Sequence, residues 1–282
     1  MAPQVVLMTG CSSGIGLSTA RRLAQDPDQR YLVFATVIAM AEKTELVAAV
    51  GDAIDKTIFI KEMDVTKDED ITRVVNDVVK THGRIDILIN VAGIALVALP
   101  ERVSRAQIDT IFNVNTIGTI RLTQAVLPHM KQKKAGKIIC LTSGPYTDFY
   151  CASKFALEGF FESLLSTLKS FNIRVCLIEP AKVETGMITS MLSQTDALVN
   201  DDTVHDIDRR QLRCFFDVVT GMPGISVADV VDVLMTKCVD VDDPVFRHLV
   251  VPPEAKEALG EAVADLTGEK SIAALRKMIV AV

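Results

Sequence analysis

The sequence has no tryptophan and only three tyrosines among its 282 residues. It also lacks a basic stripe: 36 acidic residues outnumber 30 basic ones, and the net charge of −6 argues against nucleic acid as a partner. No apolar run approaches the ~20 residues that cross a bilayer, and no basic segment precedes the first apolar run. We therefore expect no transmembrane segment and no signal peptide, and we predict a cytoplasmic protein. Peripheral attachment to a membrane is the alternative.

Metal-binding and disulfide patterns are missing as well. There is no CxxC motif and no cysteine–histidine cluster with metal-ligand spacing, so we expect no metal site. Several cysteines lie inside apolar runs such as KIICLTS, which indicates buried thiols in a reducing compartment. The four histidines share no neighbourhood, and without a G-x-S-x-G elbow a serine hydrolase is disfavoured. The scattered cysteines are Cys11, Cys140, Cys151, Cys176, Cys214 and Cys238.

Short apolar runs alternate with helical patterns along the first 185 residues. The runs are continuous rather than alternating in polarity, which is typical of parallel strands covered on both faces. The alternation predicts an α/β fold with a doubly wound, Rossmann-like parallel sheet. The strong runs are 5–10, 85–90, 137–143 and 174–180, the weaker ones 31–35 and 57–65, and the helical patterns 15–25, 39–50, 67–81, 104–131 and 150–170.

The rhythm changes after Glu184. Residues 186–224 read as irregular and polar with scattered methionines and phenylalanines, and helical patterns resume at 226–239 and 254–280. Because no linker separates these parts, we predict one domain over 1–282, with a substrate lid at 186–224 and a helical extension at 225–282. Phe215 and Phe216 are its candidate substrate contacts. Ordinary packing of this segment onto the C-terminal helices is the alternative.

The first predicted strand ends in the glycine-rich stretch TGCSSGIGL, and a helix pattern follows at once. Gly10, Gly14 and Gly16 would let the backbone turn tightly and approach a pyrophosphate at the positive end of that helix. The alternative is a tight connection without a ligand. The end of the second strand, where dinucleotide folds place a ribose-binding acid, carries Val37, Ile38 and Ala39, so it does not discriminate between NAD and NADP.

Tyr150 and Lys154 stand four residues apart in YCASK, on one face of a predicted helix. A tyrosine with a pKa near ~10 is a poor base at neutral pH unless a cation stabilises its phenolate. Lys154 would supply that charge. A chance pair on a helix surface is the alternative.

Together, the glycine turn and the Tyr150–Lys154 pair resemble the short-chain dehydrogenase/reductase family, over roughly residues 4–185. Further matches follow in order: Asp64-Val65, the NVAG stretch at 90–93, the NTIG stretch at 115–118, and Pro180 with Val183 and Thr185. The sequence looks closest to the branch that holds estradiol 17β-dehydrogenase and photoreceptor-type retinol dehydrogenase. The resemblance implies NAD(H) or NADP(H) as cofactor and a small lipophilic alcohol or ketone, steroid-like or retinoid-like, as substrate.

The resemblance also implies a role for each matching residue. Tyr150 would be the general acid/base, Lys154 would hold the nicotinamide ribose, Ser143 would bind the substrate oxygen, and Asn115 would hold a relay water. The cofactor-binding residues implied are Gly10, Ser12, Ser13, Gly14, Ile15, Gly16, Asp64, Val65, Asn90, Ala92, Gly93, Tyr150, Lys154, Pro180, Val183 and Thr185.

Several positions depart from the family pattern. Only six residues separate Ser143 from Tyr150, about half the usual spacing, so Thr142 or Tyr146 could take the place of Ser143. Val91 and Ala181 replace an asparagine and a glycine. These departures keep open a second hypothesis, a nucleotide-binding sensor or interaction module with weakened catalysis.

The helix pattern at 150–170 is apolar almost all round. One face can rest on the sheet, but the rest of the apolar surface needs another cover. We predict a homodimer through this helix. Cover by a neighbouring helix of the same chain is the alternative.

Overall fold

A computed structural model describes residues 2–143, 148–221 and 223–252. In this part of the chain, parallel strands form one 7-stranded sheet in the order β3-β2-β1-β4-β5-β6-β7. The predicted doubly wound α/β sheet is confirmed. The strands are β1 Gln4–Met8, β2 Tyr31–Val37, β3 Ile58–Glu62, β4 Ile87–Asn90, β5 Gly136–Leu141, β6 Ile173–Pro180 and β7 Arg247–Val250.

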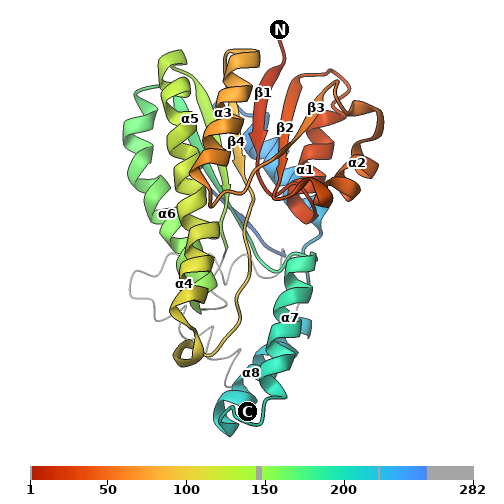
Figure 1. Ribbon diagram of the computed structural model, residues 1–282, viewed down its shortest axis with the longest axis vertical. Helices are drawn as coiled ribbons and strands as arrows, with labels where there is room; N and C mark the ends of the chain where they lie inside the picture. The colour runs from red at the N-terminus through yellow and green to blue at the C-terminus, as the bar shows by residue number, and fades with distance from the viewer. Residues whose placement is uncertain (1, 144–147, 222, 253–282) are drawn as a thin grey trace.

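Helices cover both faces of the sheet, as Figure 1 shows. One core cluster packs α1, α2 and α9 against the strands, and the other packs α3, α5 and α6 against the opposite face. Central strands are buried on both sides, which explains their continuous apolar runs. The helices are α1 Gly14–Ala24, α2 Thr44–Val50, α3 Asp68–His82, α4 Arg105–Phe112, α5 Thr119–Lys133, α6 Asp148–Lys169, α7 Gly186–Val199, α8 Asp206–Gly221 and α9 Val227–Val233.

The pattern at 104–131 does not form one regular helix. A capping box between Ser104 and Gln107 starts α4, and a π-helical turn at Asn113–Gly118 joins α4 to α5. The close approach of Gly118 to Val65 accompanies this change, because a Cβ at Gly118 would lie 2.7 Å from the Val65 carbonyl oxygen. The wider turn therefore brings the 113–118 backbone against the end of β3. Such π-helical turns occur often at functional sites.

The expectation of an irregular segment at 186–224 is wrong. It holds two helices, α7 and α8, which pack on each other and project beyond the end of the sheet (Figure 1). Their polar and apolar residues alternate at helical spacing, but both helices carry few fully buried side chains. A mixed segment of this kind is easily mistaken for a loop.

The C-terminal part also differs from the prediction. After α9 a second π-helical turn, Leu234–Val239, leads to β7, which adds an edge strand beside β6. The sequence pattern did not indicate this strand, because RHLV is short and mostly half-buried. The predicted helix at 254–280 lies outside the described residues.

Candidate active site

A cleft opens at the carboxyl ends of the strands, where α/β sheets bind their ligands. It encloses a cavity of about 250 Å³ between the β1–α1 turn, the ends of β4, β5 and β6, and α7 with α8. Most residues predicted from the sequence meet here. Those that line it are Gly10, Ser12, Ser13, Gly14, Ile15, Gly16, Ala92, Gly93, Ser143, Tyr150, Lys154, Pro180, Val183, Thr185 and Phe215.

We call residues 10–16 together with 90–93 the glycine corner. Gly10 has φ +69°, and a Cβ there would lie 2.8 Å from the backbone nitrogen of Ala92. At Gly16 an added Cβ would come within 2.0 Å of the Gly10 carbonyl oxygen. Only glycine fits these two positions, so the backbone turns closely enough to leave the start of α1 open to the cleft.

A side-chain hydroxyl that follows β1 holds the part of the glycine corner that follows β4. The Thr9 hydroxyl accepts hydrogen bonds from the backbone N–H of Val91 (3.0 Å) and of Ala92 (3.1 Å). Asn90, the first residue of the 90–93 part of the corner, is only 3% exposed, and its amide has no hydrogen-bond partner among the described residues. It does not line the cleft, so its predicted contact with a cofactor is not visible in this arrangement.

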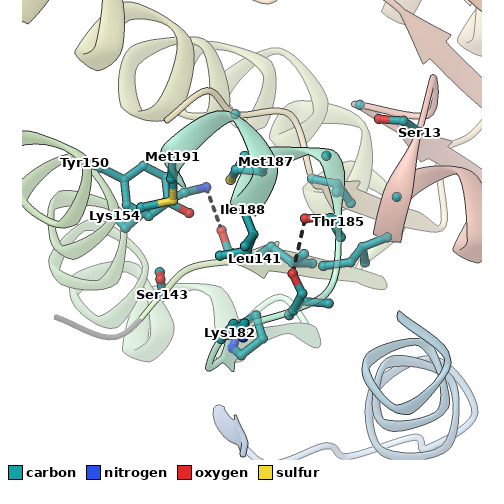
Figure 2. A pocket seen from close by; sticks show the side chains of 18 of the residues that line it. Ser13, Leu141, Ser143, Tyr150, Lys154, Lys182, Thr185, Met187, Ile188 and Met191 are labelled. Atoms are coloured by element: carbon teal, nitrogen blue, oxygen red, sulfur yellow. Dashed lines mark hydrogen bonds between the residues drawn. The ribbon is translucent and has the colours of Figure 1, made fainter. Parts of the chain in front are cut away.

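Tyr150 and Lys154 lie on the buried side of the first turns of α6 (Figure 2). The Lys154 ammonium lies 5.9 Å from the centre of the Tyr150 ring and donates a hydrogen bond to the Leu141 carbonyl (3.1 Å). Gly93 closes the other side, since a Cβ there would be 3.3 Å from Lys154 Nζ. The pair is therefore a buried feature of the cleft and not a surface coincidence.

Ser143 follows β5 and lines the cleft with Tyr150, and its side chain lowers the pKa of the phenol, despite the short connection between them. Thr142 also lines the cleft. Tyr146, the other alternative, lies outside the described residues. Of the two hydroxyls that the structure describes, Ser143 is the one that acts on the phenol.

Burial dominates the proton affinities at this site. It raises the pKa of Tyr150 to about 12, against a smaller lowering by the Ser143 hydrogen bond. Burial also lowers the pKa of Lys154, because an ammonium loses solvation in the interior. The sequence argument expected Lys154 to depress the pKa of Tyr150. In the protein alone, the loss of solvent around the phenol raises the pKa of Tyr150 instead.

Asn115 lies in the π-helical turn and is completely buried. Its amide accepts a hydrogen bond from the Ile94 N–H (2.8 Å) and donates to the Ile94 carbonyl (2.9 Å) and the Ser153 hydroxyl (3.0 Å). Both amide N–H groups are therefore used within the protein. The side chain joins the turn to α6 and to the loop that follows the glycine corner.

Asp64 and Val65 lie outside the cleft lining, at the end of β3. The Asp64 carboxylate accepts hydrogen bonds from the N–H (2.9 Å) and hydroxyl (2.7 Å) of Thr66. Burial would raise the pKa of Asp64, but these bonds and Lys67 hold it below its ordinary value. Asp64 is thus ionised at neutral pH and fixed in place. At the end of β2, Ile38 is 56% exposed and offers no polar group to a ribose.

We call α7 and α8 the lid helices. Met187, Ile188 and Met191 of α7 line the cleft opposite Tyr150, and Met187 packs against the Tyr150–Cys151 cluster (Figure 2). From α8, Phe215 lines the cavity, whereas Phe216 does not belong to its described lining. The two phenylalanines named together from the sequence therefore have different surroundings.

Sequence reasoning missed the residues that fix these parts to one another. Gln194 of α7 accepts a hydrogen bond from the Val97 N–H (2.9 Å), which joins the lid helices to the loop after β4. Ser153 accepts from Asn115 and donates to the Tyr150 carbonyl (2.6 Å). Its place between the tyrosine and the lysine of the YCASK stretch was the available signal. Gln194 had none, because its partner is a backbone amide far away in the chain.

No helix in the described parts of the chain is long and apolar enough to cross a membrane.

Residues 4–196 match the family described as short chain dehydrogenase. Human retinol dehydrogenase 8 is 42% identical over 199 residues, which cover 68% of this chain and 63% of that protein. Human 17-beta-hydroxysteroid dehydrogenase type 1 is 35% identical over 217 residues, which cover 74% of this chain and 66% of the relative. The chain thus spans less than two thirds of the length of the retinol dehydrogenase it matches.

Solved structures show the same architecture. A short-chain dehydrogenase from Streptomyces avermitilis superposes with a TM-score of 0.76 at 24% identity, covering 97% of this chain and 98% of its own. ElxO with NADP bound superposes with a TM-score of 0.70 at 20% identity, covering 88% and 96%. The likeness in sequence, which covers most of the sheet and the whole glycine corner, identifies this chain as a member of the short-chain dehydrogenase family.

Proposed function

We propose that this protein is an NAD(P)-dependent oxidoreductase that interconverts a lipophilic alcohol and its ketone or aldehyde. One observation carries the proposal: Tyr150, Lys154 and Ser143 face the same apolar-lidded cleft as the glycine corner. The names of the retinol and 17-beta-hydroxysteroid dehydrogenases to which the chain is similar support a retinoid-like or steroid-like substrate.

The residues at the corner fit a nicotinamide dinucleotide. The open start of α1 presents backbone N–H groups and the positive end of a helix, and Ser12 and Ser13 add hydroxyls beside it. Lys154 lies beside Gly93, where it can donate to ribose hydroxyls. Asp64 at the end of β3 is our candidate for the adenine contact. When bound, the cofactor would supply or accept the hydride.

The residues around the substrate oxygen would handle its proton and charge. Tyr150 gives a proton to a carbonyl oxygen during reduction and removes one from the alcohol during oxidation. Ser143, which lines the cleft with Tyr150, donates to the same oxygen and stabilises the charge that develops there. Lys154 favours the phenolate by its charge. Asn115 joins the π-helical turn to α6 by donating to Ser153, which lies between Tyr150 and Lys154 in the sequence.

A lipophilic substrate is supported by the lid side of the cleft. Methionine side chains are flexible and fit irregular apolar shapes, and α7 places Met187 and Met191 over the cavity. Phe215 adds a flat apolar surface from α8. A bulky ring or polyene would bury apolar area against these residues that a small ketone would leave empty.

The test is turnover in purified protein. NADH and NADPH are mixed in turn with a panel of retinals and ketosteroids, and the absorbance of the reduced nicotinamide is followed. We expect turnover with one member at least, and a fall in kcat of about 10²- to 10⁴-fold in Tyr150→Phe. Tyr31→Phe is the matched control. Tyr31 lies on β2, outside the cleft lining, and its hydroxyl donates a hydrogen bond to Asp240 (2.7 Å).

The second candidate is a nucleotide-binding sensor with weakened catalysis. The high pKa of Tyr150 favours it, because a phenol that stays protonated is a poor base. This candidate predicts that NADPH fluorescence changes on binding while no substrate in the panel turns over. Equal cofactor affinity in wild type and Tyr150→Phe, without activity in either, would overturn the enzyme proposal.

We also propose a cytoplasmic homodimer. No disulfide joins any of the six cysteines, all within the described residues, which fits a reducing compartment.

The dimer is supported by the surface of α6, which the rest of the chain covers only in part. Phe160 and Leu164 pack on the core, but Phe155 is 44% exposed, and Ala156 and Gly159 beside it are exposed as well. Light scattering should give twice the chain mass, and Phe155→Asp should give a monomer. A wild-type monomer at micromolar concentration would contradict this.

A further inference from the structure

Two thiols and an imidazole meet in the interior on the α9 side of the sheet, away from the cleft. Cys176 lies on β6, Cys238 lies in the π-helical turn Leu234–Val239, and His248 lies on β7. Their ligand atoms are all within 4.8 Å of one another, and both cysteines are fully buried. We propose that these three side chains bind one thiophilic metal ion of low charge, Cu⁺ in preference to Zn²⁺.

The sheet register explains how residues distant in the sequence come together. Ile178 of β6 pairs with His248 of β7, so Cys176, two residues earlier on β6, points to the same face as His248. Cys238 reaches this face from the helical layer that covers it. No spacing rule would find the group in the sequence, because each ligand comes from a different element.

His248 has a ring nitrogen available to a metal. Its Nε2 atom is buried and has no hydrogen-bond partner among the described residues. The ligand atoms of His248 and the two cysteines all lie within 4.8 Å of one another, so an ion bound to the thiols can also bind the imidazole.

The two cysteines can bind one metal together. Their Sγ atoms lie within 4.8 Å of each other, and both side chains are fully buried. A metal replaces the thiol protons when it binds. Lys137 of β5 points to the same face of the sheet as Cys176, and its ammonium donates to the Val239 and Val241 carbonyls (2.7 Å each).

The local charges favour a monovalent ion. Two thiolates, a neutral imidazole and the Lys137 ammonium carry one net negative charge, which Cu⁺ cancels and Zn²⁺ overcompensates. Asp240 and Asp242 also act on Lys137, but both residues are exposed, and Asp240 is paired with Arg30 (2.9 Å). The described ligand group holds three members, whereas structural zinc takes four. Two soft sulfurs and one nitrogen suit Cu⁺.

The experiment is a competition titration of the reduced full-length protein without oxygen. Cu⁺ is added against a chromophoric Cu⁺ chelator, and a parallel titration uses Zn²⁺ against a zinc indicator. We expect wild type to hold one equivalent of Cu⁺, with a rise in Tm, and copper K-edge absorption to show two sulfur ligands and one nitrogen. Cys176→Ser and His248→Gln should weaken binding by more than the ~10- to 100-fold that loss of an outer-shell partner costs.

Cys214→Ser is the matched control, since it removes a half-buried thiol from α8 and should leave the equivalent of Cu⁺ in place. His248→Gln keeps a polar side chain on the half-buried edge strand. This variant should therefore fold even if the buried serine of Cys176→Ser prevents folding. The proposal fails if wild type holds no Cu⁺ against the chelator, if Cys176→Ser or His248→Gln holds it equally well, or if Zn²⁺ binds more tightly.

Discussion

The glycine corner and the lid helices border the same cleft, but the protein builds them in opposite ways. At the corner, backbone contacts leave no space, as the 2.0 Å approach of an added Cβ at Gly16 to Gly10 shows. The lid helices face the cleft with half-buried side chains such as Met187 and Phe215. A site fixed by backbone tolerates almost no substitution, whereas a site lined by flexible side chains can change its ligand. The family's shared cofactor chemistry would thus reside at the corner, and substrate preference at the lid.

The largest effect is expected at Gly16. In Gly16→Ala the new methyl would collide with the Gly10 carbonyl oxygen, so the β1–α1 turn must open. We expect a loss of about 3 kcal/mol in the free energy of unfolding and loss of measurable NADPH binding. Urea unfolding and NADPH fluorescence measure the two effects.

Gly14→Ala is the matched control in the same turn. Gly14 has φ +54°, but its added Cβ would meet only the Thr185 methyl at an ordinary 3.4 Å. The cost should be limited to the left-handed backbone, roughly 1 to 2 kcal/mol. If the two variants lose equal stability, close backbone packing does not distinguish Gly16, and the comparison with the lid weakens.

The next largest effect concerns Lys154. Lys154→Met removes the cation beside Tyr150, so the phenolate loses stabilisation and the pKa of Tyr150 in the cofactor complex should rise by one unit or more, ~1.4 kcal/mol per unit. Alcohol oxidation needs the phenolate, so its alkaline rise should move to higher pH and its rate at pH 8 should fall tenfold or more. Cofactor affinity should fall with it. Lys154→Arg keeps the charge and should retain part of the activity.

Thermal stability shows whether Lys154→Met loses activity through its chemistry or because the variant unfolds. Because the folded-state pKa of Lys154 is lowered, the folded protein binds this proton more weakly than the unfolded chain does. The buried charge therefore destabilises the fold fully at pH values below that lowered pKa. The penalty shrinks as pH rises above it and disappears only above the pKa of the lysine in the unfolded chain. Lys154→Met should melt at or above the wild-type Tm at pH 7. An unchanged pH profile and unchanged cofactor affinity would show that Lys154 and Tyr150 do not act together.

A smaller effect is expected on the lid side. Phe215→Ala opens the cavity wall, so KM should rise about tenfold for a bulky substrate, ~1.4 kcal/mol, and little for a small ketone. Phe216→Ala is the control, because Phe216 neighbours Phe215 on α8 but lies outside the described cleft lining. Equal losses for both substrates, or in both variants, would indicate that α8 serves packing and not substrate selection.

The same contrast explains what the sequence could predict. The local backbone requires glycines at 10, 14 and 16, and Tyr150 and Lys154 are one helical turn apart. Both motifs can therefore be found from their spacing alone. The lid helices could not be predicted reliably from their helical spacing, because α7 and α8 pack on each other and carry few fully buried side chains. Strand β7 could not be predicted either, because its pairing with β6 is fixed by tertiary contacts. The approach of Cys176 to His248 follows from that pairing.

The smallest expected effect is at Gln194, which ties the lid helices to the loop that follows the glycine corner. Its side-chain oxygen accepts the Val97 N–H at 2.9 Å, and its amide donates to the Ser190 hydroxyl at 3.1 Å. Gln194→Ala removes one partly buried hydrogen bond, about 1 kcal/mol, so the Val97 amide should exchange with solvent several-fold faster. KM for a bulky substrate should rise by a similar factor while NADPH affinity stays constant. Gln194→Glu keeps an acceptor for Val97, and Ser190 can turn its hydroxyl to donate, so this variant should retain slow exchange. If Gln194→Ala weakens NADPH binding as much as substrate binding, the lid helices and the glycine corner are one cooperative unit, and the contrast between them fails.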